Sequence, residues 1–339
     1  EDNHTEFFQE VMKWGDEQFF KSKLALNTKD TDKEYVNAED AFAHLFNKKD
    51  LSQIQEAVLW KKYSVADGVF HRLGALLASG AVDGQGPSGL SKSLVDNYLN
   101  ADGTFINPKD EKYKDFNEMF KERDARLLVT VMHSGPDCKY RASSPTNKPM
   151  NVRAYDATGT EDEMKEKNED IVSPNLNGDG NSKSVTGFHI RLGIDTTYVD
   201  NESETVVVLF RYAEGLLCYA EAAEELDLCT DDVLNKTLKP LRERAGVTYV
   251  KPTKADPNFP FTGLSPVLQE IRRERRSELA LQGFRLDDLM RWAVAGTLKG
   301  QDGRGRGAYL GEDGVLYKSF SPKGRESLKL VLKDNDGWT

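Results

Sequence analysis

The sequence predicts a mainly α fold, built from antiparallel helical pairs that carry a loop-rich face and a few short strands. Two observations support this prediction. Apolar residues recur at helical spacing over most of residues 211–292. Residues 134–186, in contrast, are polar and rich in Gly, Asn and Pro, with little periodicity, which is typical of long loops. We therefore expect a single domain over residues 1–339, with a helical scaffold and an irregular surface.

The first part of the chain, residues 1–80, is predicted to be helical. Phe7, Phe8, Val11 and Met12 form one amphipathic set, and residues 40–46 form another. The apolar run at residues 55–63 is too short for its periodicity to distinguish a helix from a strand, so both remain open.

Residues 81–210 are predicted to be loop-rich with short strands. Residues 81–91 contain Gly, Pro and Ser and indicate a loop, and helical spacing follows at residues 94–99 and again at 113–121. The β-branched run at residues 127–132 predicts a strand that ends near His133. Two more short strands are expected at residues 188–192 and 206–210.

Residues 211–295 are predicted to form the helical scaffold, followed by an irregular tail at 296–339. Residues 211–226 place leucines and alanines close to helical spacing. Thr230 is a suitable N-cap for the next helix, which Pro240 should kink or divide and Gly246 should end. Two such helices span about 34 residues, the size of one tetratricopeptide unit.

The most distinctive segment is residues 266–292, which we interpret as a helix, a turn at Gly283 and a second helix that starts near Arg285. Four arginines between positions 272 and 276 allow two interpretations: a basic face that binds RNA or phosphate, or an internal network of ion pairs. Glu274 and Glu278 lie among the arginines at pairing distance along a helix, so the sequence favours the network.

Composition excludes several classes of protein. The formal net charge of −10 argues against a nucleic-acid binder and against adsorption to an anionic membrane surface. No stretch is long and apolar enough for a transmembrane helix. The chain starts with neither Met nor a signal peptide, which suggests a processed or truncated product.

The three cysteines, Cys138, Cys218 and Cys229, show no metal-ligand spacing and are interpreted as structural thiols.

The sequence lacks the motifs of common catalytic, metal and cofactor sites. We therefore expect no enzyme activity, no cofactor and no bound metal. The nearest metal motif, residues 175–180 (NLNGDG), resembles the first half of a calcium loop. It starts with Asn instead of Asp, and its twelfth position would be Thr186 where a glutamate belongs. A surface turn is the alternative interpretation of this segment.

Several segments together resemble one known family. Residues 272–292 (RRERRSELALQGFRLDDLMRW) closely resemble the C-terminal signature of the SusD/RagB family. Residues 211–222 (RYAEGLLCYAEA) and 241–247 (LRERAGV) resemble two further family segments. Weaker similarities upstream, at residues 93–103, 123–127 and 186–188, and the terminal DGW at 336–338, follow in the family's order.

The resemblance implies a lipid-anchored protein on the outward face of a bacterial outer membrane in Bacteroidota. Such proteins capture nutrients, usually oligo- or polysaccharides, and deliver them to a SusC-like TonB-dependent transporter. Family members are considerably longer, so the resemblance implies a chain that lacks its N-terminal part, including the lipid anchor. A peptide-capturing member of the family is the first alternative, and a glycan-degrading surface enzyme is the second.

Candidate ligand residues come from side-chain chemistry, because the shared motifs are scaffold residues. Sugar sites combine aromatic faces with polar side chains that bind hydroxyl groups. Tyr140, Tyr155 and Trp60 have charged neighbours and are predicted as ligand-binding residues, with core packing as the alternative for each.

Overall fold

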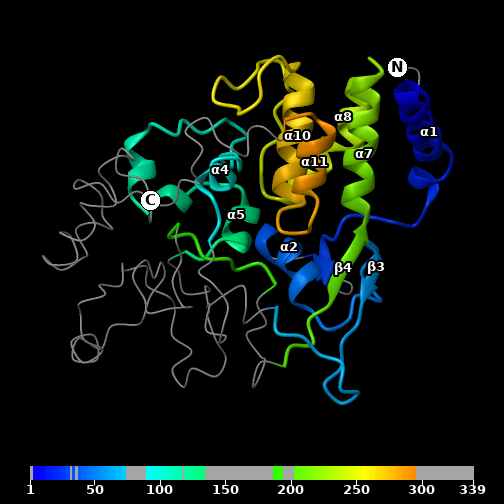
Figure 1. Cartoon of the computed structure of the whole chain (residues 1–339), viewed down its shortest axis with the longest axis vertical. Helices are drawn as coiled ribbons and strands as arrows, with labels where there is room; N and C mark the ends of the chain where they lie inside the picture. Colours follow the sequence, from blue (N-terminus) through cyan, green and yellow to red (C-terminus); the bar gives the residue numbers. More distant parts are fainter. Residues whose placement is uncertain are drawn as a thin grey trace, which may run out of the picture.

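A computed structural model describes residues 3–30, 33–34, 37–73, 89–116, 118–133, 186–193 and 202–294 (Figure 1). Its described part is mainly helical, as predicted. Helices α1 (Asn3–Glu17), α7 (Tyr212–Glu225) and α10 (Pro266–Glu278) lie roughly side by side. A two-stranded antiparallel ribbon, β3 (Ala57–Lys61) with β4 (Val207–Arg211), lies at one end of α7.

Two glycines allow α1 and the turn after it to approach α7 closely. A β-carbon on Gly15 of α1 would lie 2.3 Å from the ring of Tyr219, and one on Gly215 of α7 would lie 2.5 Å from Phe19. Phe19 belongs to the short 3-10 helix η1 (Phe19–Lys21), and its ring stacks on Tyr212 at 4.6 Å. A larger residue at either glycine would therefore separate these helices.

The pair that was expected to match one tetratricopeptide unit consists of α7 and a divided second helix. Thr230 caps α8 (Asp231–Lys236) by accepting a hydrogen bond from Val233 N, as predicted. The helix is interrupted at Thr237, and α9 (Leu238–Arg244) follows. The cause is Pro240, which lacks an N–H for the Lys236 carbonyl and whose ring would clash with that carbonyl in a continuous helix.

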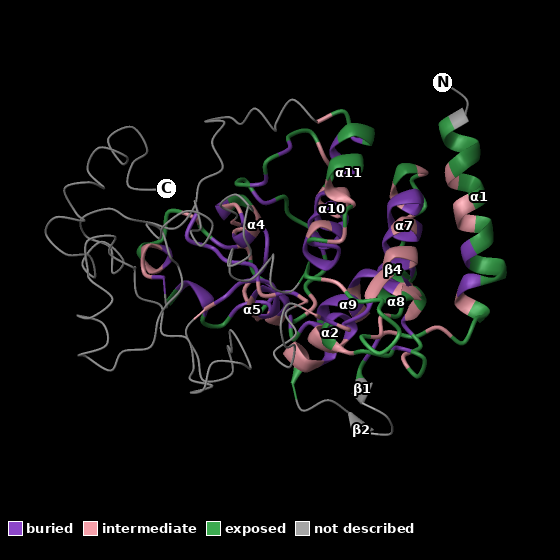
Figure 2. Ribbon diagram, turned by 60° about the horizontal axis from the view of Figure 1, so that its bottom comes forward, coloured by how far each residue is buried: buried purple, intermediate pink, exposed green. Residues whose placement is uncertain are grey.

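The predicted helix–turn–helix at residues 266–292 is confirmed. Ser265 caps α10 through a hydrogen bond from Leu268 N to its Oγ at 3.0 Å, and Pro266 occupies the first helical position. The turn contains Gly283 at φ +91, and α11 (Arg285–Arg291) follows it. Figure 2 shows that α10 is largely buried despite its charges.

Between α1 and β3, the chain forms helix α2 (Ala38–Asn47), whose N-cap Asn37 accepts a hydrogen bond from Asp40 N at 2.8 Å. It also includes a small ribbon of β1 (Lys29–Asp30) and β2 (Lys33–Glu34). The helices expected in residues 1–80 are therefore present as α1 and α2, whereas the ambiguous run at 55–63 contains strand β3. Its partner β4 confirms the strand that was predicted at 206–210.

Residues 89–133 form short helices around an aromatic core. They are α4 (Lys92–Val95), the 3-10 helices η2 (Glu111–Lys114) and η3 (Glu118–Phe120), and α5 (Ala125–Thr130). The strand predicted at 127–132 is wrong, because Asp124 caps a helix there by accepting a hydrogen bond from Arg126 N. The strand predicted at 188–192 is also wrong: Ile190 forms only an isolated bridge to Val131.

Candidate functional site

The arginine-rich helix α10 was the first candidate for a binding face, and the structure places most of its charges in the interior. Glu278 is fully buried and accepts hydrogen bonds from Arg126, Arg211 and Arg244. Arg126 also binds Glu274, and Arg211 and Arg244 both bind Glu56. We call this set, with Glu270 and Arg242, the buried charge network. It confirms the interpretation of internal ion pairs.

The electrostatics of the network favour ionised carboxylates. Burial alone would raise the pKa of Glu278, but the charges of Arg244, Arg211 and Arg126 outweigh burial and lower that pKa below its usual value. The same balance lowers the pKa of Glu270, where Arg273 and Arg242 supply the charge. These glutamates are therefore poor proton donors, and their oxygen atoms are already occupied by arginines.

Of the three predicted ligand residues, the structure describes Trp60. It lies on β3, opposite Val208 of β4, and is half-buried. Tyr140, Tyr155 and the calcium-like segment at residues 175–180 lie outside the described residues. Tyr140 and Tyr155 therefore stay predictions.

The residues that follow Trp60 in the chain combine aromatic and charged groups. The ring of Tyr63 packs edge-on against His71 at 4.5 Å, and Lys61 Nζ lies 5.5 Å from the Tyr63 ring centre. His71 is fixed in turn, because its Nε2 lies 2.7 Å from the carbonyl oxygen of Thr205. This arrangement offers aromatic faces next to polar side chains, which is the chemistry of sugar recognition.

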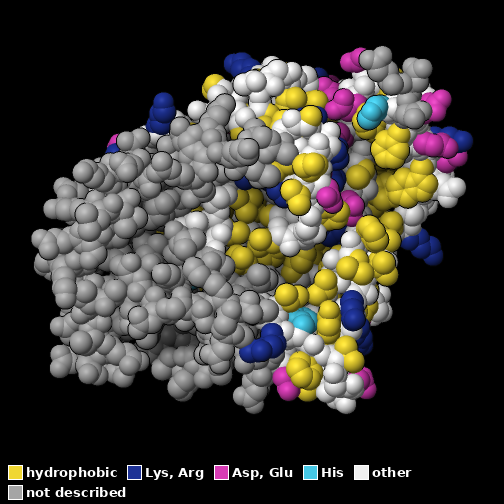
Figure 3. Space-filling model, viewed as in Figure 1, with side chains coloured by type: hydrophobic (Ala, Val, Ile, Leu, Met, Phe, Trp, Pro, Cys, Tyr) yellow, Lys and Arg dark blue, Asp and Glu magenta, His cyan; other side chains and the backbone are white. Residues whose placement is uncertain are grey.

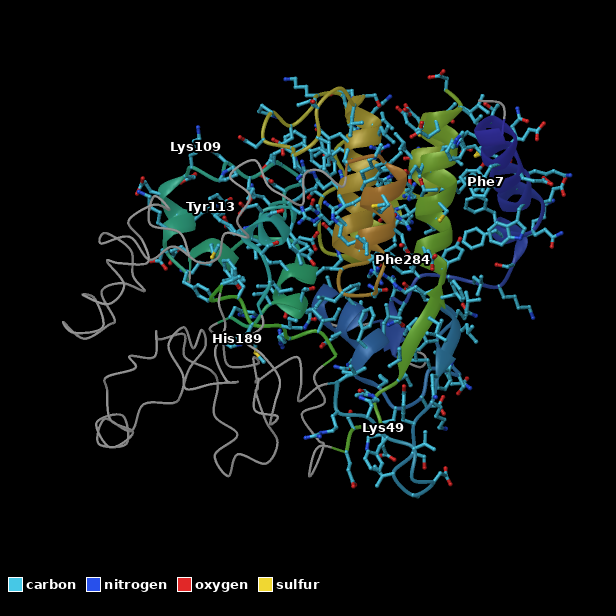
Figure 4. All side chains as sticks on the ribbon, in the orientation of Figure 1. Phe7, Lys49, Lys109, Tyr113, His189 and Phe284 are labelled. Carbon is cyan, nitrogen blue, oxygen red and sulfur yellow. The ribbon has the colours of Figure 1, made fainter. Side chains whose placement is uncertain are left out.

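Two exposed ion pairs flank the ribbon. Lys62 binds Asp50 at 2.7 Å, and Lys49, labelled in Figure 4, binds Glu204 at 2.8 Å. The hydrogen bonds from Lys62 and Ser52 lower the pKa of Asp50, so this carboxylate is ionised at neutral pH. Carboxylates and ammonium groups of this kind can exchange partners with the hydroxyl groups of a ligand.

The ribbon also exposes an apolar surface that sequence reasoning missed. Leu59 and Phe210 are paired across the strands and are 48% and 51% exposed. Val58 and Leu209 are exposed beside them. Figure 3 shows hydrophobic atoms on the right side of the molecule, including the part below α7 where Figure 1 places β3 and β4. The sequence did offer one signal of this exposure: apolar and polar residues do not strictly alternate in residues 57–61. In a ribbon that is buried on one face only, they do alternate.

The described residues contain no group of three or more His, Cys, Asp or Glu side chains arranged to hold a metal ion. Cys218 and Cys229 are free thiols, and burial raises the pKa of both. No helix among the described residues combines the length and the apolar character needed to cross a bilayer.

Comparisons with known proteins identify the family. The sequence model of the SusD family matches residues 51–326. The chain belongs to the SusD family. The matched region includes α11 and also α10, which carries Glu270, Glu274 and Glu278 of the buried charge network. No curated protein sequence matches this chain.

Solved structures of family members share the fold. A SusD-like carbohydrate binding protein from Bacteroides fragilis NCTC 9343 is 22% identical, with a TM-score of 0.58; the match covers 95% of this chain and 54% of that one. A SusD-like protein from the same organism is 18% identical, with a TM-score of 0.57 and coverage of 86% and 52%. The chain therefore spans about half the length of these SusD-like structures.

Proposed function

We propose that this chain binds oligo- or polysaccharides at the bacterial cell surface, as part of a protein that captures nutrients without chemically changing them. Membership of the SusD family is the observation that carries the proposal. One structural neighbour is itself described as a carbohydrate binding protein. In the full-length protein, a lipid anchor would hold this binding unit on the outward face of the outer membrane.

The surface around Trp60 supports glycan binding on chemical grounds. An aromatic ring can contact the C–H face of a sugar, and the neighbouring lysines and carboxylates can bind its hydroxyl groups. Tyr63, three residues further along the chain, is also half-buried. We propose that Trp60 contacts the glycan and that Tyr140 and Tyr155 add further aromatic contacts.

The proposal also assigns no catalytic role to the chain. Catalysis of glycosidic hydrolysis needs one carboxyl group that donates a proton and a second that acts as base or nucleophile. Glu56, Glu274 and Glu278 lie in the buried charge network, where arginines occupy them. They are thus not available to a substrate.

Calorimetric titration with neutral and acidic oligosaccharides tests glycan binding. We expect Trp60→Ala to weaken binding roughly tenfold, because stacking on one aromatic ring contributes about 1 kcal/mol or more. Tyr140→Ala and Tyr155→Ala should weaken binding without lowering the melting temperature. Phe7→Ala is the matched control, since this exposed aromatic side chain lies on α1 (Figure 4).

The alternatives give different results in the same assays. Binding of peptides but not of saccharides would replace glycan capture by peptide capture. Release of shorter sugars from a soluble oligosaccharide by the purified protein would overturn the non-catalytic assignment. Unchanged affinity in the variants at Trp60, Tyr140 and Tyr155 would remove these residues from the site.

We further propose that the full-length protein delivers its ligand to a SusC-like TonB-dependent transporter. The family resemblance supports this step, and co-purification from the native membrane tests it. Recovery of the tagged full-length protein without any such transporter, under conditions that preserve outer-membrane complexes, would contradict the proposal.

A further inference from the structure

The segment between η1 and β1 has the side-chain pattern of a strand and leaves part of its backbone unpaired. Leu24 and Leu26 pack against the core around Leu216, whereas Ala25 between them is exposed. This alternation is typical of an extended chain. The backbone groups of Ala25 and Leu26 form no hydrogen bond to another described residue. Successive residues of a strand direct these groups to opposite edges, so each edge of the segment presents one free N–H and one free C=O.

Buried polar contacts hold this segment in place. Asn27 N donates a hydrogen bond to Glu56 Oε2 at 2.6 Å, and Asn27 Nδ2 donates one to the carbonyl oxygen of Ala41 at 2.8 Å. Glu56 is part of the buried charge network, so the segment is attached to the scaffold. An edge that is already ordered can accept a ligand at a lower entropic cost than a mobile loop.

A cavity of about 580 Å³ lies along the segment, and its volume is within the range of small-ligand sites. Figure 1 shows the segment, in blue, crossing the end of α7 where β4 joins that helix. Leu216 and Arg244 are buried in the lining, whereas the other lining side chains are half-buried or exposed and can meet a ligand. These are Leu24, Ala25, Leu26 and Thr28 of the segment, with Tyr212, Lys236, Pro240 and Glu243 of α7, α8 and α9.

The accessible apolar lining is mainly aliphatic. Leu24, Leu26 and Pro240 supply it, and all three are half-buried. The one aromatic ring, Tyr212, already stacks on Phe19 at 4.6 Å, so one of its faces is occupied. A sugar ring prefers an open aromatic face, whereas an aliphatic surface suits an apolar side chain. The lining therefore favours a ligand with an apolar side chain over a saccharide.

The lining also carries charges of both signs. Lys236 is the last residue of α8, and Glu243 lies in the last turn of α9. Each forms an exposed ion pair, Lys236 with Asp232 at 2.6 Å and Glu243 with Lys239 at 3.9 Å. Exposed pairs of this kind are weak, because water competes for both groups. An ammonium and a carboxylate beside one cavity can thus contact the two charged ends of a zwitterion.

We propose that this cavity binds a short peptide with free termini, in an extended conformation. The peptide pairs with the unpaired backbone of the segment, as an added strand pairs with the edge of a sheet. Its apolar side chain packs against the leucines, its carboxylate contacts Lys236 and its ammonium group contacts Glu243. The site does not include Trp60, and it does not depend on the glycan binding proposed there.

Calorimetric titration with tripeptides tests the proposal. The probes are Ala-Leu-Ala, Ala-Val-Ala and Ala-Phe-Ala with free termini. We expect saturable binding of these peptides and roughly tenfold weaker binding of triglycine, which lacks the side chain whose burial favours the complex. No saturable binding of any of the three apolar tripeptides would overturn the proposal.

Two further probes separate a free peptide from other ligands. Ala-Leu-Ala with an acetylated N-terminus and an amidated C-terminus should bind more weakly than the free peptide, because it lacks both charges. Equal affinity would assign the cavity to an internal segment of a protein and contradict the proposal. Maltotriose should not displace Ala-Leu-Ala. Displacement would assign the cavity to saccharides.

Variants locate the binding in the cavity. Ala25→Phe should weaken peptide binding roughly tenfold or more, since a large side chain at this exposed position fills the cavity without disturbing the core. Lys236→Gln and Glu243→Gln should each weaken binding roughly three- to fivefold, because each removes an exposed charge. The control is Lys109→Gln, an exposed cation outside the cavity (Figure 4). Unchanged affinity in all three cavity variants, with melting temperatures like that of the wild type, would refute the site.

Discussion

The buried charge network and the β3–β4 ribbon reverse the usual distribution of polar and apolar side chains. The network places Glu278, Arg126 and Arg244 in the interior, where each is 5% exposed or less. The ribbon, in contrast, leaves Leu59 and Phe210 about half exposed. The two regions meet at Arg211, which ends β4 and binds both Glu56 and Glu278.

This contrast separates residues that hold the fold from residues that can meet a partner. A buried charge with several ionic partners is costly to change, because any substitution leaves other charges without compensation. An exposed apolar side chain contributes little to folding and remains available for contact. The segment of α10 and α11 that resembles the family's pattern contains mainly the first kind of residue, so the resemblance identifies the fold and leaves the ligand open.

The largest expected effect comes from removing the centre of the network. We expect Glu278→Ala to lower the free energy of unfolding by about 3–5 kcal/mol, because it leaves Arg126, Arg211 and Arg244 short of negative charge. Urea unfolding measures the change. Phe210→Thr, on the strand that Arg211 ends, is a control on the ribbon side. If the two variants unfold at the same urea concentration, the contrast between the two regions does not hold.

Acid should weaken the network before it affects the ribbon. Arginine charges lower the pKa of Glu278 and Glu270 in the folded protein below the ordinary value of 4.5. The unfolded chain therefore binds more protons near pH 4, and the stabilisation, complete above about pH 4.5, is lost as pH falls toward the folded-state pKa. Urea unfolding between pH 7 and pH 3 measures this loss. The Glu278→Gln variant should show a shallower dependence, and an identical slope would contradict the assignment.

The apolar surface of the ribbon should tolerate polar substitution. We expect Leu59→Thr to change the free energy of unfolding by no more than about 0.5 kcal/mol, as is usual for surface positions. Leu216→Ala on α7 is the matched control, because this leucine is buried and its truncation should cost about 2–5 kcal/mol. A large loss of stability in the Leu59 variant would show that the ribbon surface is part of the core.

The smallest effect is expected at the exposed ion pair between Lys62 and Asp50. Both side chains are largely solvated, and water screens their attraction. Asp50→Asn should leave the urea midpoint at pH 7 unchanged within error. A clear decrease would indicate that exposed charges, as well as buried ones, support this fold.

Local signals in the sequence were sufficient to predict those helices whose ends or interruptions are set by a single residue in or next to the helix. Thr230, Pro240 and Gly283 mark the ends and interruptions of α8, α9 and α11, and each acts through adjacent backbone groups. The prediction failed at residues 127–132, where β-branched residues favoured a strand. There the Asp124 cap and the burial of Leu127 outweigh strand propensity.

The site could be predicted only in part. The sequence placed Glu274 and Glu278 among arginines, but their partners Arg126, Arg211 and Arg244 come from distant segments that spacing cannot connect. Trp60 was chosen as a candidate because of its charged neighbours and stays a prediction, whereas the exposure of Leu59 and Phe210 depends on what packs against the ribbon. Long-range packing is the information that local periodicity lacks.

The long sequence separations within the buried charge network have a consequence for the order of folding. Glu56 and Arg244 are 188 residues apart, Arg211 and Glu56 are 155, and Arg126 and Glu278 are 152. Closing such large loops costs entropy before any contact can form. The helices should therefore pair first while these charges are still hydrated, and the network should close in a late step. Substitutions at Glu278 would then accelerate unfolding more than they slow folding.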